Sequence, residues 1–318
     1  MFSCPHCKST NTKQHHTRKT KQGLTKVLHC LSCGKVFTPN HGFWKMKSPP
    51  HIIVKALDLH DKGMSYGEIV IYLWQQENFK TTKKTIWDWV KKYSKMLDKF
   101  TSQIPIQTEG RIHMDETYVK VKGKDKYYFD AVDNKTKMSV ADHLSHTRDA
   151  DGAMKLFLSI LSSCIFLNFI HFVSDKLSGY QIAFKKIFSR TERSKHHGIV
   201  KLDWGTPIKQ KKYGIKHNNN AIERHNRHTK RKVKLLCHYK SFESAKWSLK
   251  LRRILYNFCR PHEQLNGLTP AERAGIELDL ERNKIWSLIK LFHAKLIFRG
   301  FYSLFTRIIK NNQKININ

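Results

Sequence analysis

Acidic residues are scarce in this sequence. Its 318 residues hold 25 aspartates and glutamates against 59 lysines and arginines, which gives a formal net charge of +34, and residues 1–48 contain no acid at all. An excess of one sign this large destabilises a compact chain through self-repulsion unless a polyanion is nearby, and nucleic acid is the usual one. A solvated basic surface is the alternative, but we favour a nucleic-acid partner.

Long apolar runs are also missing. The longest, at residues 164–170, is much shorter than the roughly 20 residues of a membrane-spanning helix. The start of the chain lacks the basic segment and apolar stretch of a secretory signal. Four of the seven cysteines fall in two C-x-x-C pairs and the others stand alone, which fits a reducing compartment better than a disulfide framework. We therefore expect an intracellular protein.

The two cysteine pairs are Cys4-x-x-Cys7 and Cys30-x-x-Cys33. Four thiolates in two such pairs suit a tetrahedral Zn²⁺ ion, and Gly34 eases the turn after the second pair. The metal would stabilise a segment too small to hold a core of its own. A redox pair is the alternative, disfavoured because no βαβ pattern surrounds it. We predict a structural zinc ribbon over residues 1–48.

A short helical region follows the prolines at 49 and 50, which are typical of a linker. Apolar residues recur at helical spacing in three segments up to residue 97. Ser65 is a plausible N-cap of the second segment, and Thr81 or Thr82 of the third. Three short helices with a glycine-containing turn suggest a helix-turn-helix over 49–100, although any three-helix module has the same periodicity.

The periodicity then changes to that of strands. The pattern predicts strands, then a helix, a buried strand and another helix, in the order β-β-β-α-β-α, over residues 111–122, 126–132, 138–143, 149–161, 168–174 and 179–188. More helix is expected beyond residue 219. The sequence therefore predicts an α/β fold with a mixed sheet flanked by helices.

Three acids stand out by their placement. Asp115 lies in the first strand, Asp175 follows the buried strand, and Glu223 opens a helix. Neighbouring strands can bring the two aspartates together, and the helix can lay Glu223 across them. Carboxylates of this kind suit Mg²⁺, and a pair of such ions serves phosphoryl transfer on DNA.

Each acid also has a structural interpretation. Glu116 competes with Asp115, and because strand neighbours point to opposite faces, we expect only one of them in the site. Asp175 could instead cap the following helix. Glu223 could belong to a capping box that has Asn220 as its N-cap.

The sequence resembles the DDE integrase-core transposases of bacterial and archaeal insertion sequences over about 107–275. The resemblance rests on four stretches: His113-x-Asp115-Glu116-Thr117-Tyr118 with residues 127–133; Ser174-Asp175; Asn220-x-x-Glu223-Arg224; and Tyr256-Asn257-Phe258-x-Arg260-Pro261-His262, continuing to Glu272.

This resemblance implies an RNase H-like catalytic core with Asp115, Asp175 and Glu223 as the catalytic triad, holding two Mg²⁺ or Mn²⁺ ions. It also implies recognition of terminal inverted repeats in double-stranded DNA, strand cleavage and transfer, a dimer or larger homo-oligomer, and a prokaryotic, nucleoid-associated cytoplasmic setting. A regulator or domesticated derivative that binds DNA without cutting it is the alternative. An RNase H-like nuclease is a third, but it would not explain the stretch from Tyr256 to Glu272.

The sequence departs from the family in the separation of Asp175 and Glu223, which is longer than in close relatives. The surplus falls in the basic stretch 189–216, which a surface loop would accommodate. Alternatively the third acid lies elsewhere, with Glu192 and Asp203 as candidates.

Cations are concentrated around Glu223. On a helix, Glu223, Arg227, Lys230 and Lys234 share one face, and a solvated basic helix is the alternative. The predicted DNA-binding residues are Arg224, Arg227, Lys230, Arg231 and Lys234, with Lys84 and Lys91 in the helix-turn-helix.

Two segments after the triad carry weaker signals. Asn257, Arg260 and His262 are explained by a proline-bounded turn with buried polar contacts, and we do not expect His262 to be catalytic. Residues 276–318 read as a basic amphipathic helical tail, with an apolar stripe at 284–310 that suits a core or a dimer contact. A helix lying on a membrane is the least favoured interpretation.

Overall fold

The computed structural model describes the chain except for residues 1–3, 5, 8, 21–22, 39–41, 44–45, 109–110, 166–168, 189–198, 205–218 and 298–318. The chain divides into two compact units, Met1–Val54 with Leu280–Asn318 and Lys55–Asp279. Glu192, part of the basic stretch and about half of the predicted tail therefore lie outside the described residues. Within the described part, no helix is long and apolar enough to cross a membrane.

The first unit contains a small antiparallel sheet and one helix. Strands β1 (Thr12–Thr20), β2 (Gly23–Cys30) and β3 (Val36–Phe37) pair in that order. In helix α10 (Lys284–Ile297), Ile285, Leu288 and Ile289 are buried. Trp286 lies against Phe43 with ring centroids 5.5 Å apart. The described part of the apolar stripe therefore forms a core with the N-terminal segment.

The three expected helices are α1 (Pro50–Asp61), which begins before the second unit and continues into it, and α2 (Tyr66–Glu77) and α3 (Lys83–Thr101), which lie within it. Ser65 caps α2 in a capping box, accepting from the Glu68 N–H at 3.2 Å, and Thr82 caps α3 by accepting from Thr85 N–H at 3.2 Å. These hydroxyls satisfy N–H groups that have no partner inside the helix. Helix α3 packs on α8 (Phe242–Phe258).

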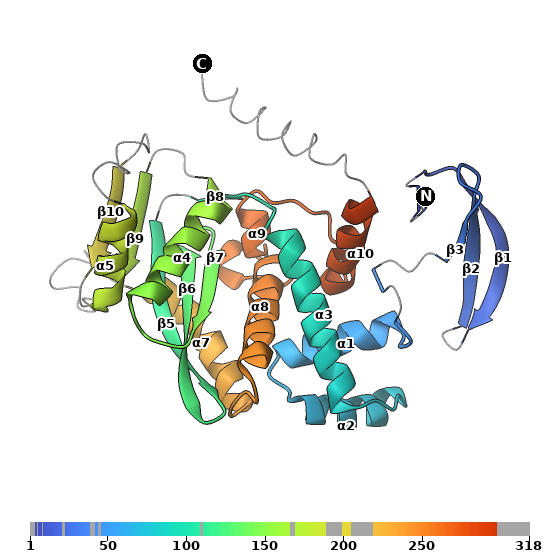
Figure 1. Cartoon of the computed structure of the whole chain (residues 1–318), viewed down its shortest axis with the longest axis horizontal. Helices are drawn as coiled ribbons and strands as arrows, with labels where there is room; N and C mark the ends of the chain where they lie inside the picture. The colour runs from blue at the N-terminus through green and yellow to red at the C-terminus, as the bar shows by residue number, and fades with distance from the viewer. Residues whose placement is uncertain are drawn as a thin grey trace, which may run out of the picture. The chain divides into compact units, whose positions relative to one another are not determined.

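A five-stranded mixed sheet forms the centre of this unit (Figure 1). Its strand order is β10-β9-β5-β6-β7, where β5 (Arg111–Val121), β6 (Lys124–Asp133) and β7 (Ser139–Ser145) are antiparallel. Strand β9 (Phe169–Ser174) runs parallel to β5 and to β10 (Ile199–Trp204). Three antiparallel strands continued by two parallel ones, with the first strand central, make an RNase H-like fold.

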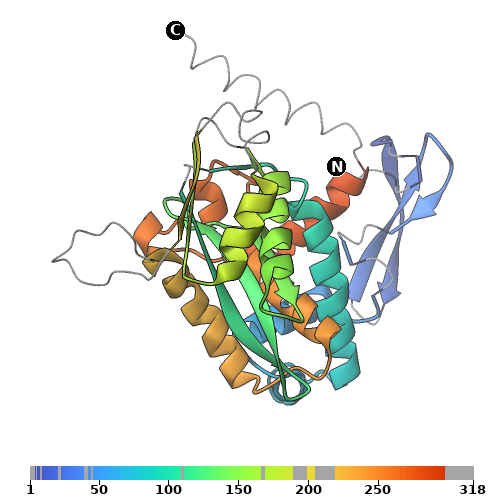
Figure 2. The same ribbon diagram turned by 60° about the vertical axis from the view of Figure 1, so that its left-hand side comes forward.

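Helices cover both faces of the sheet (Figure 2). On one face, α4 (Ala150–Ser163) and α5 (Ser178–Ile187) lie against Phe129, which touches Tyr180 with ring centroids 6.1 Å apart. On the other face lies α7 (Asn220–Leu235), whose His225 bonds Asp130. Neighbours on β6 therefore point to opposite helical layers, as the pleat requires.

Shorter elements complete the second unit. Strands β4 (Ile106–Gln107) and β8 (Cys164–Ile165) pair in parallel. After α8 come a 3-10 turn at Glu263–Leu265 and α9 (Pro270–Arg273), which begins with a capping box at Thr269.

Strand β10 corrects one prediction. We interpreted residues 189–216 as a surface loop, but Ile199–Trp204 pairs with β9 along its whole length, from Ile199 opposite Phe169 to Trp204 opposite Ser174. The apolar residues of this strand are separated by Lys201 and Asp203 and stand in a strongly basic stretch, which obscured the alternation. The longer separation of Asp175 and Glu223 therefore includes an edge strand of the sheet.

Candidate active site and zinc site

The acids meet where β9 stops pairing with β5. The last parallel pair is His113 with Val173, and β9 ends at Ser174. Beyond this point the edge of β5 is open on that side, and Asp115 and Glu116 lie beside Asp175, which follows β9. Oxygen atoms of these three carboxylates lie within 4.8 Å of one another. The structure therefore brings Asp115 and Asp175 together, as predicted.

The expectation that only one of Asp115 and Glu116 would reach this cluster is wrong. Their side chains do leave β5 on opposite faces, because Asp115 bonds Asn226 of α7 whereas Glu116 bonds Tyr180 of α5. Within the described residues, β5 no longer pairs with β9 at these positions, so both carboxylates reach Asp175 from either side. The Cβ directions of Asp115 and Glu116 alternate as they do in any strand. Their carboxylates still meet, because the side chains extend beyond the unpaired edge.

Asp115 is held by an amide and surrounded by acids. Asn226 Nδ2 donates a 2.9 Å hydrogen bond to Asp115 Oδ2. Burial and the charge of Glu116 raise the pKa of Asp115 to about 7, while the Asn226 bond and Lys230 oppose the shift. A cation beside Asp115 would therefore relieve a local excess of negative charge.

Glu116 already has a counterion within the protein. Arg148 Nε donates to Glu116 Oε1 at 2.6 Å, the same guanidinium forms a second contact through Nη2, and Tyr180 donates to Oε2 at 3.2 Å. Burial and the charge of Asp175 still raise the pKa of Glu116. Its side chain is only 2% exposed, against 30% for Asp175.

Asp175 shapes the turn between β9 and α5. Its Oδ1 accepts from the Leu177 N–H at 3.0 Å, and Leu177, the N-cap of α5, makes no side-chain capping bond. Asp175 therefore holds the turn without capping the helix, and its Oδ2 lies 3.9 Å from Arg148. The capping explanation that we considered for Asp175 does not apply.

Glu223 lies in the first turn of α7 and is exposed. The capping-box interpretation is wrong, because the N-cap is Asn219 and not Asn220, and Asn219 makes no capping bond with its side chain. Instead the Asn219 amide donates to Met114 O at 3.0 Å and pairs with His113 Nδ1 at 3.1 Å. Among the described acids, Glu223 does not join the cluster of Asp115, Glu116 and Asp175.

The helix nevertheless directs Glu223 towards β5. Asn219 and Asn226 both bond residues of β5 between His113 and Asp115. Glu223 comes four residues after the first and three before the second, spacings that share one helical face. The backbone around Glu223 is therefore tied to the strand that carries Asp115.

The alternative third acid Asp203 is engaged elsewhere. On β10 it accepts from His171 Nε2 at 2.5 Å and pairs with Lys201 at 3.0 Å. These contacts outweigh its burial, so that its pKa is lowered. Glu192, the other candidate, lies outside the described residues.

The predicted DNA-binding cations differ in their surroundings. The five predicted lysines and arginines of α7 are exposed and form no ion pair within the described residues. They are Arg224, Arg227, Lys230, Arg231 and Lys234. In α3, by contrast, Lys84 pairs with Asp88 at 2.6 Å and lies over the Trp87 ring, and Lys91 pairs with Glu243 at 2.9 Å. The α7 cations are thus the ones left open to a polyanion.

Several residues of the site escaped the sequence analysis. Asn219 and Asn226 carried a signal, since they flank Glu223 at helical spacing. Arg148 and Tyr180 carried none, because only the fold brings them to Glu116.

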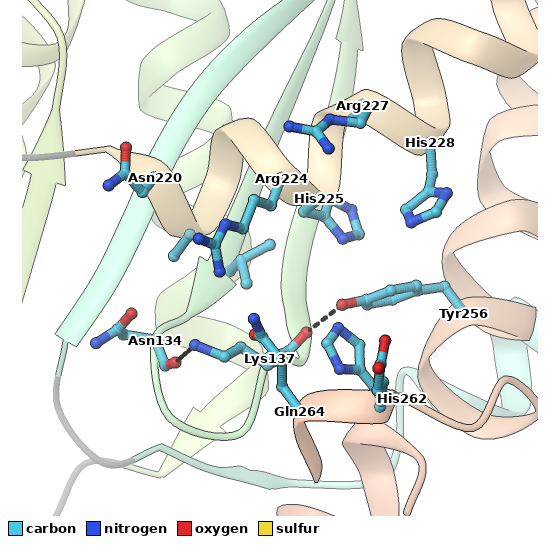
Figure 3. Close-up of a pocket in the computed structure, with 13 residues that line it drawn as sticks. Asn134, Lys137, Asn220, Arg224, His225, Arg227, His228, Tyr256, His262 and Gln264 are labelled. Atoms are coloured by element: carbon cyan, nitrogen blue, oxygen red, sulfur yellow. Dashed lines mark hydrogen bonds between the residues drawn. The ribbon is translucent and has the colours of Figure 1, made fainter. Parts of the chain in front are cut away.

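Beside the acids, on the flank of α7, lies a basic pocket of about 710 Å³ (Figure 3). Its walls come from the turn after β6, from α7 and from the segment that follows α8. His262, which we expected in a structural turn, lines it together with Lys137 and Arg224.

The four cysteines of the first unit converge. The Sγ atoms of Cys4 and Cys33 are 3.6 Å apart, those of Cys7 and Cys30 are 3.4 Å apart, and all four lie within 4.8 Å of one another. Thiolates bound tetrahedrally at the usual Zn–S length would be about 3.8 Å apart. Gly34 adopts a φ of +66°, the conformation expected of it after the second pair. The donor set fits a Zn²⁺ ion.

Comparison with known proteins agrees with this geometry. Residues 109–260 match the model of a transposase family described as the DDE domain, a range that includes Asp115, Asp175 and Glu223. No curated protein matches the sequence.

Two solved structures are distantly similar. The HTLV-2 integrase catalytic core domain in complex with magnesium is 14% identical over 54% of this chain and 99% of its own, with a TM-score of 0.37. A simian T-cell lymphotropic virus intasome in complex with PP2A regulatory subunit B56 gamma is 11% identical over 69% of this chain and 74% of its own, with a TM-score of 0.37. Residues 109–260 are thus similar to the DDE domain of a transposase family.

Proposed function

We propose that the chain binds the terminal repeats of a DNA element and cleaves and joins DNA strands with divalent metal ions held by Asp115, Asp175 and Glu223. The observation that carries this proposal is the meeting of Asp115 and Asp175 at the open edge of β5, within 4.8 Å of each other. Hard carboxylate oxygens at this spacing suit Mg²⁺ or Mn²⁺.

Glu223 is the better third ligand although Glu116 lies nearer. Glu116 is neutralised by Arg148 and bonded by Tyr180, so binding a cation would require it to exchange partners it already has. Glu223 is exposed on a helix whose Asn219 and Asn226 are fixed to β5. A change of its side-chain rotamer, or a small movement of the first turn of α7, would bring its carboxylate towards the aspartates.

The residues around the acids have distinct tasks in this scheme. Asn226 orients Asp115, and the Leu177 N–H orients Asp175. Arg148 balances the charge of Glu116 and lies within 3.9 Å of Asp175. When bound, the ions would activate the attacking water or 3′-hydroxyl and stabilise the leaving oxygen. The open cations of α7 would grip the phosphates on either side of the cut.

Further parts of the proposal concern partners and setting. The helices α1 to α3 and the zinc ribbon would recognise the repeats, with Lys84 and Lys91 near the DNA. Bringing two ends of an element together requires at least two copies of the chain, so we propose a homo-oligomer on double-stranded DNA. The setting would be the nucleoid of a prokaryotic cell.

A strand-cleavage and joining assay tests the proposal. Supercoiled DNA carrying the terminal repeats is incubated with the protein and Mg²⁺ or Mn²⁺, beside the Asp115→Asn and Asp175→Asn variants. We expect cleavage by the wild type only, with DNA binding retained by all three proteins. DNA binding without cleavage by the wild type in either metal would favour the regulator or inactive derivative.

A further inference from the structure

The basic pocket beside α7 gathers basic side chains from three separate segments (Figure 3). Lys137 comes from the turn after β6, Arg224 and Arg227 from α7, and His262 from the segment after α8. The only acid among the lining residues is Glu263. Its volume of about 710 Å³ lies within the usual range for pockets that bind small ligands or parts of larger ones.

Two buried imidazole nitrogens in this pocket have no partner within the described residues. His225, only 6% exposed, donates from Nε2 to Asp130 Oδ2 at 2.8 Å, but its Nδ1 is buried and unbonded. His262 Nδ1 is likewise buried and unbonded. An unsatisfied buried polar atom costs about 1–3 kcal/mol. A phosphate oxygen, which only accepts hydrogen bonds, would relieve this cost where the nitrogen carries a proton, and would reach it after a small side-chain movement because both atoms are buried.

The potential in the pocket is positive. Burial and the charges of Arg260 and Arg252 lower the pKa of His228 to about 4. Burial also lowers the pKa of His262, with Lys137 and Arg260 acting in the same direction. The exposed guanidinium groups of Arg224 and Arg227 have no ion pair within the described residues. An anion entering the pocket would therefore meet unpaired positive charge.

Residues at the end of α8 hold two walls of this pocket together. Tyr256 donates its hydroxyl to Lys137 O at 2.9 Å, and Asn257 bonds the backbone of Ser139 at 3.0 and 2.8 Å. These contacts fix the end of α8 to the β6–β7 turn. The segment that holds His262 and the turn that holds Lys137 are thereby kept at a fixed separation across the pocket.

We propose that this pocket binds a phosphate group of the DNA strand that passes the acidic cluster, as a DNA site separate from the cleavage site. The inference rests on the proposed function. His225 lines the pocket while the next residue, Asn226, bonds Asp115, so one helix separates the two sites. The open cations Lys230, Arg231 and Lys234 continue along α7, which favours a polymer of phosphates over a free phosphate.

Single-residue variants of the full chain test this proposal without requiring catalysis. Lys137→Asn removes the charge, and asparagine tolerates the positive φ of 59° found there. His262→Gln removes the unbonded nitrogen. Lys155→Asn removes a charge from the exposed surface of α4, where Lys155 pairs with Asp151 at 2.6 Å, and serves as the matched control.

Binding of a single-stranded oligonucleotide and of its duplex is measured without Mg²⁺ over a range of salt concentrations. We expect Lys137→Asn to lower the slope of log K against log salt by about 0.7–0.9, the effect of one lost phosphate contact. His262→Gln should weaken binding, and Lys155→Asn should change neither quantity. The proposal would be overturned if Lys137→Asn and His262→Gln both had the same salt slope and the same DNA affinity as Lys155→Asn.

Inorganic phosphate identifies the source of the anion. Nitrogen-15 spectra of the histidine side chains are recorded during titration with phosphate and, separately, with the oligonucleotide. Shifts of the pocket histidine signals on addition of the oligonucleotide support a DNA site. If the signals shift with inorganic phosphate and not with the oligonucleotide, the pocket binds a free anion and the proposal is overturned. If His262→Gln does not fold by circular dichroism, Lys137→Asn carries the test. Failure of strand cleavage in the assay above leaves these outcomes unaffected.

Discussion

At the scale of single residues, neighbouring groups act in opposite directions on the ionisation of Asp115. Burial and the charge of Glu116 disfavour its ionised form, and the Asn226 amide favours it. Asn226 also fixes the direction in which the carboxylate presents its oxygens. A metal ligand oriented in this way loses less freedom when it binds an ion.

Replacing Asn226 with leucine, which is similar in size, should therefore impair metal use. We expect the Mg²⁺ concentration needed for half-maximal cleavage to rise, and the cleavage rate to fall, by about 10- to 100-fold, as is usual when a partner of a metal ligand is lost. DNA affinity should stay unchanged, because Asn226 is buried and contacts Asp115. Cleavage at the wild-type rate and Mg²⁺ requirement would show that Asn226 has no orienting role.

At the scale of elements, the four-cysteine sheet of the first unit is predicted to depend on a bound metal. Its hydrophobic cluster is small, with Leu28 and Phe37 packed around Cys4 and Cys30. Strand β1 is exposed along nearly its whole described length. So little buried apolar surface does not hold a sheet together without a further constraint.

We expect the purified protein to contain about one Zn²⁺ per chain and the Cys30→Ser variant to contain none. Metal content is measured by elemental analysis, and the fold of the ribbon by amide hydrogen exchange over residues 12–37. Cys237→Ser, which removes an exposed free cysteine, is the control and should retain the metal. A protected ribbon in metal-free Cys30→Ser would contradict the account.

Much of this architecture follows from local patterns. Alternation in β5 to β7, the buried run of β9, and the caps at Ser65 and Thr82 were readable because propensity and burial agree there. Strand β10 was missed because its basic surroundings resemble a loop, and only pairing with β9 makes it a strand.

The site was predictable in part. Asp115 and Asp175 were found because strand ends place acids at one edge of a sheet. The position of Glu116 was not, since it depends on where the pairing of β5 with β9 ends, which is a property of the sheet and not of the sequence nearby. The start of α7 was misplaced by one residue because Asn219 and Asn220 are equally good caps.

At the scale of the whole second unit, a buried cation joins its helices. Lys232 of α7 is 2% exposed, and its ammonium lies 3.9 Å from Asp61 of α1, which also lies 3.8 Å from Arg252 of α8. Two cations thus share one acid in the interior. Burial lowers the pKa of Lys232 from 10.5 to about 8, and Asp61 opposes the shift.

This arrangement predicts a pH dependence of stability. Below about pH 8 Lys232 is charged in both the folded and unfolded states, and its burial cost is fully present. Between about 8 and 10.5 the unfolded chain holds a proton that the folded one has released, so the free energy of unfolding rises with pH.

In urea unfolding, Lys232→Met should therefore be more stable than the wild type near pH 7, and the difference should shrink by up to about 3 kcal/mol as pH rises to 10. Subtracting the two proteins removes the titration of groups they share. A difference that stays constant from pH 7 to 10 would contradict the depressed pKa of Lys232.

The most direct test of the account concerns the third carboxylate. Binding of Mn²⁺ to the full chain is followed by electron paramagnetic resonance for the wild type, Glu223→Gln and Glu116→Gln, a matched pair that removes one charge at a time while keeping the side-chain shape. The account predicts that Glu223→Gln loses most of the affinity, whereas Glu116→Gln, whose charge Arg148 already balances, retains it. Loss in Glu116→Gln with normal binding by Glu223→Gln would contradict the proposed triad and assign the metal to Asp115, Glu116 and Asp175.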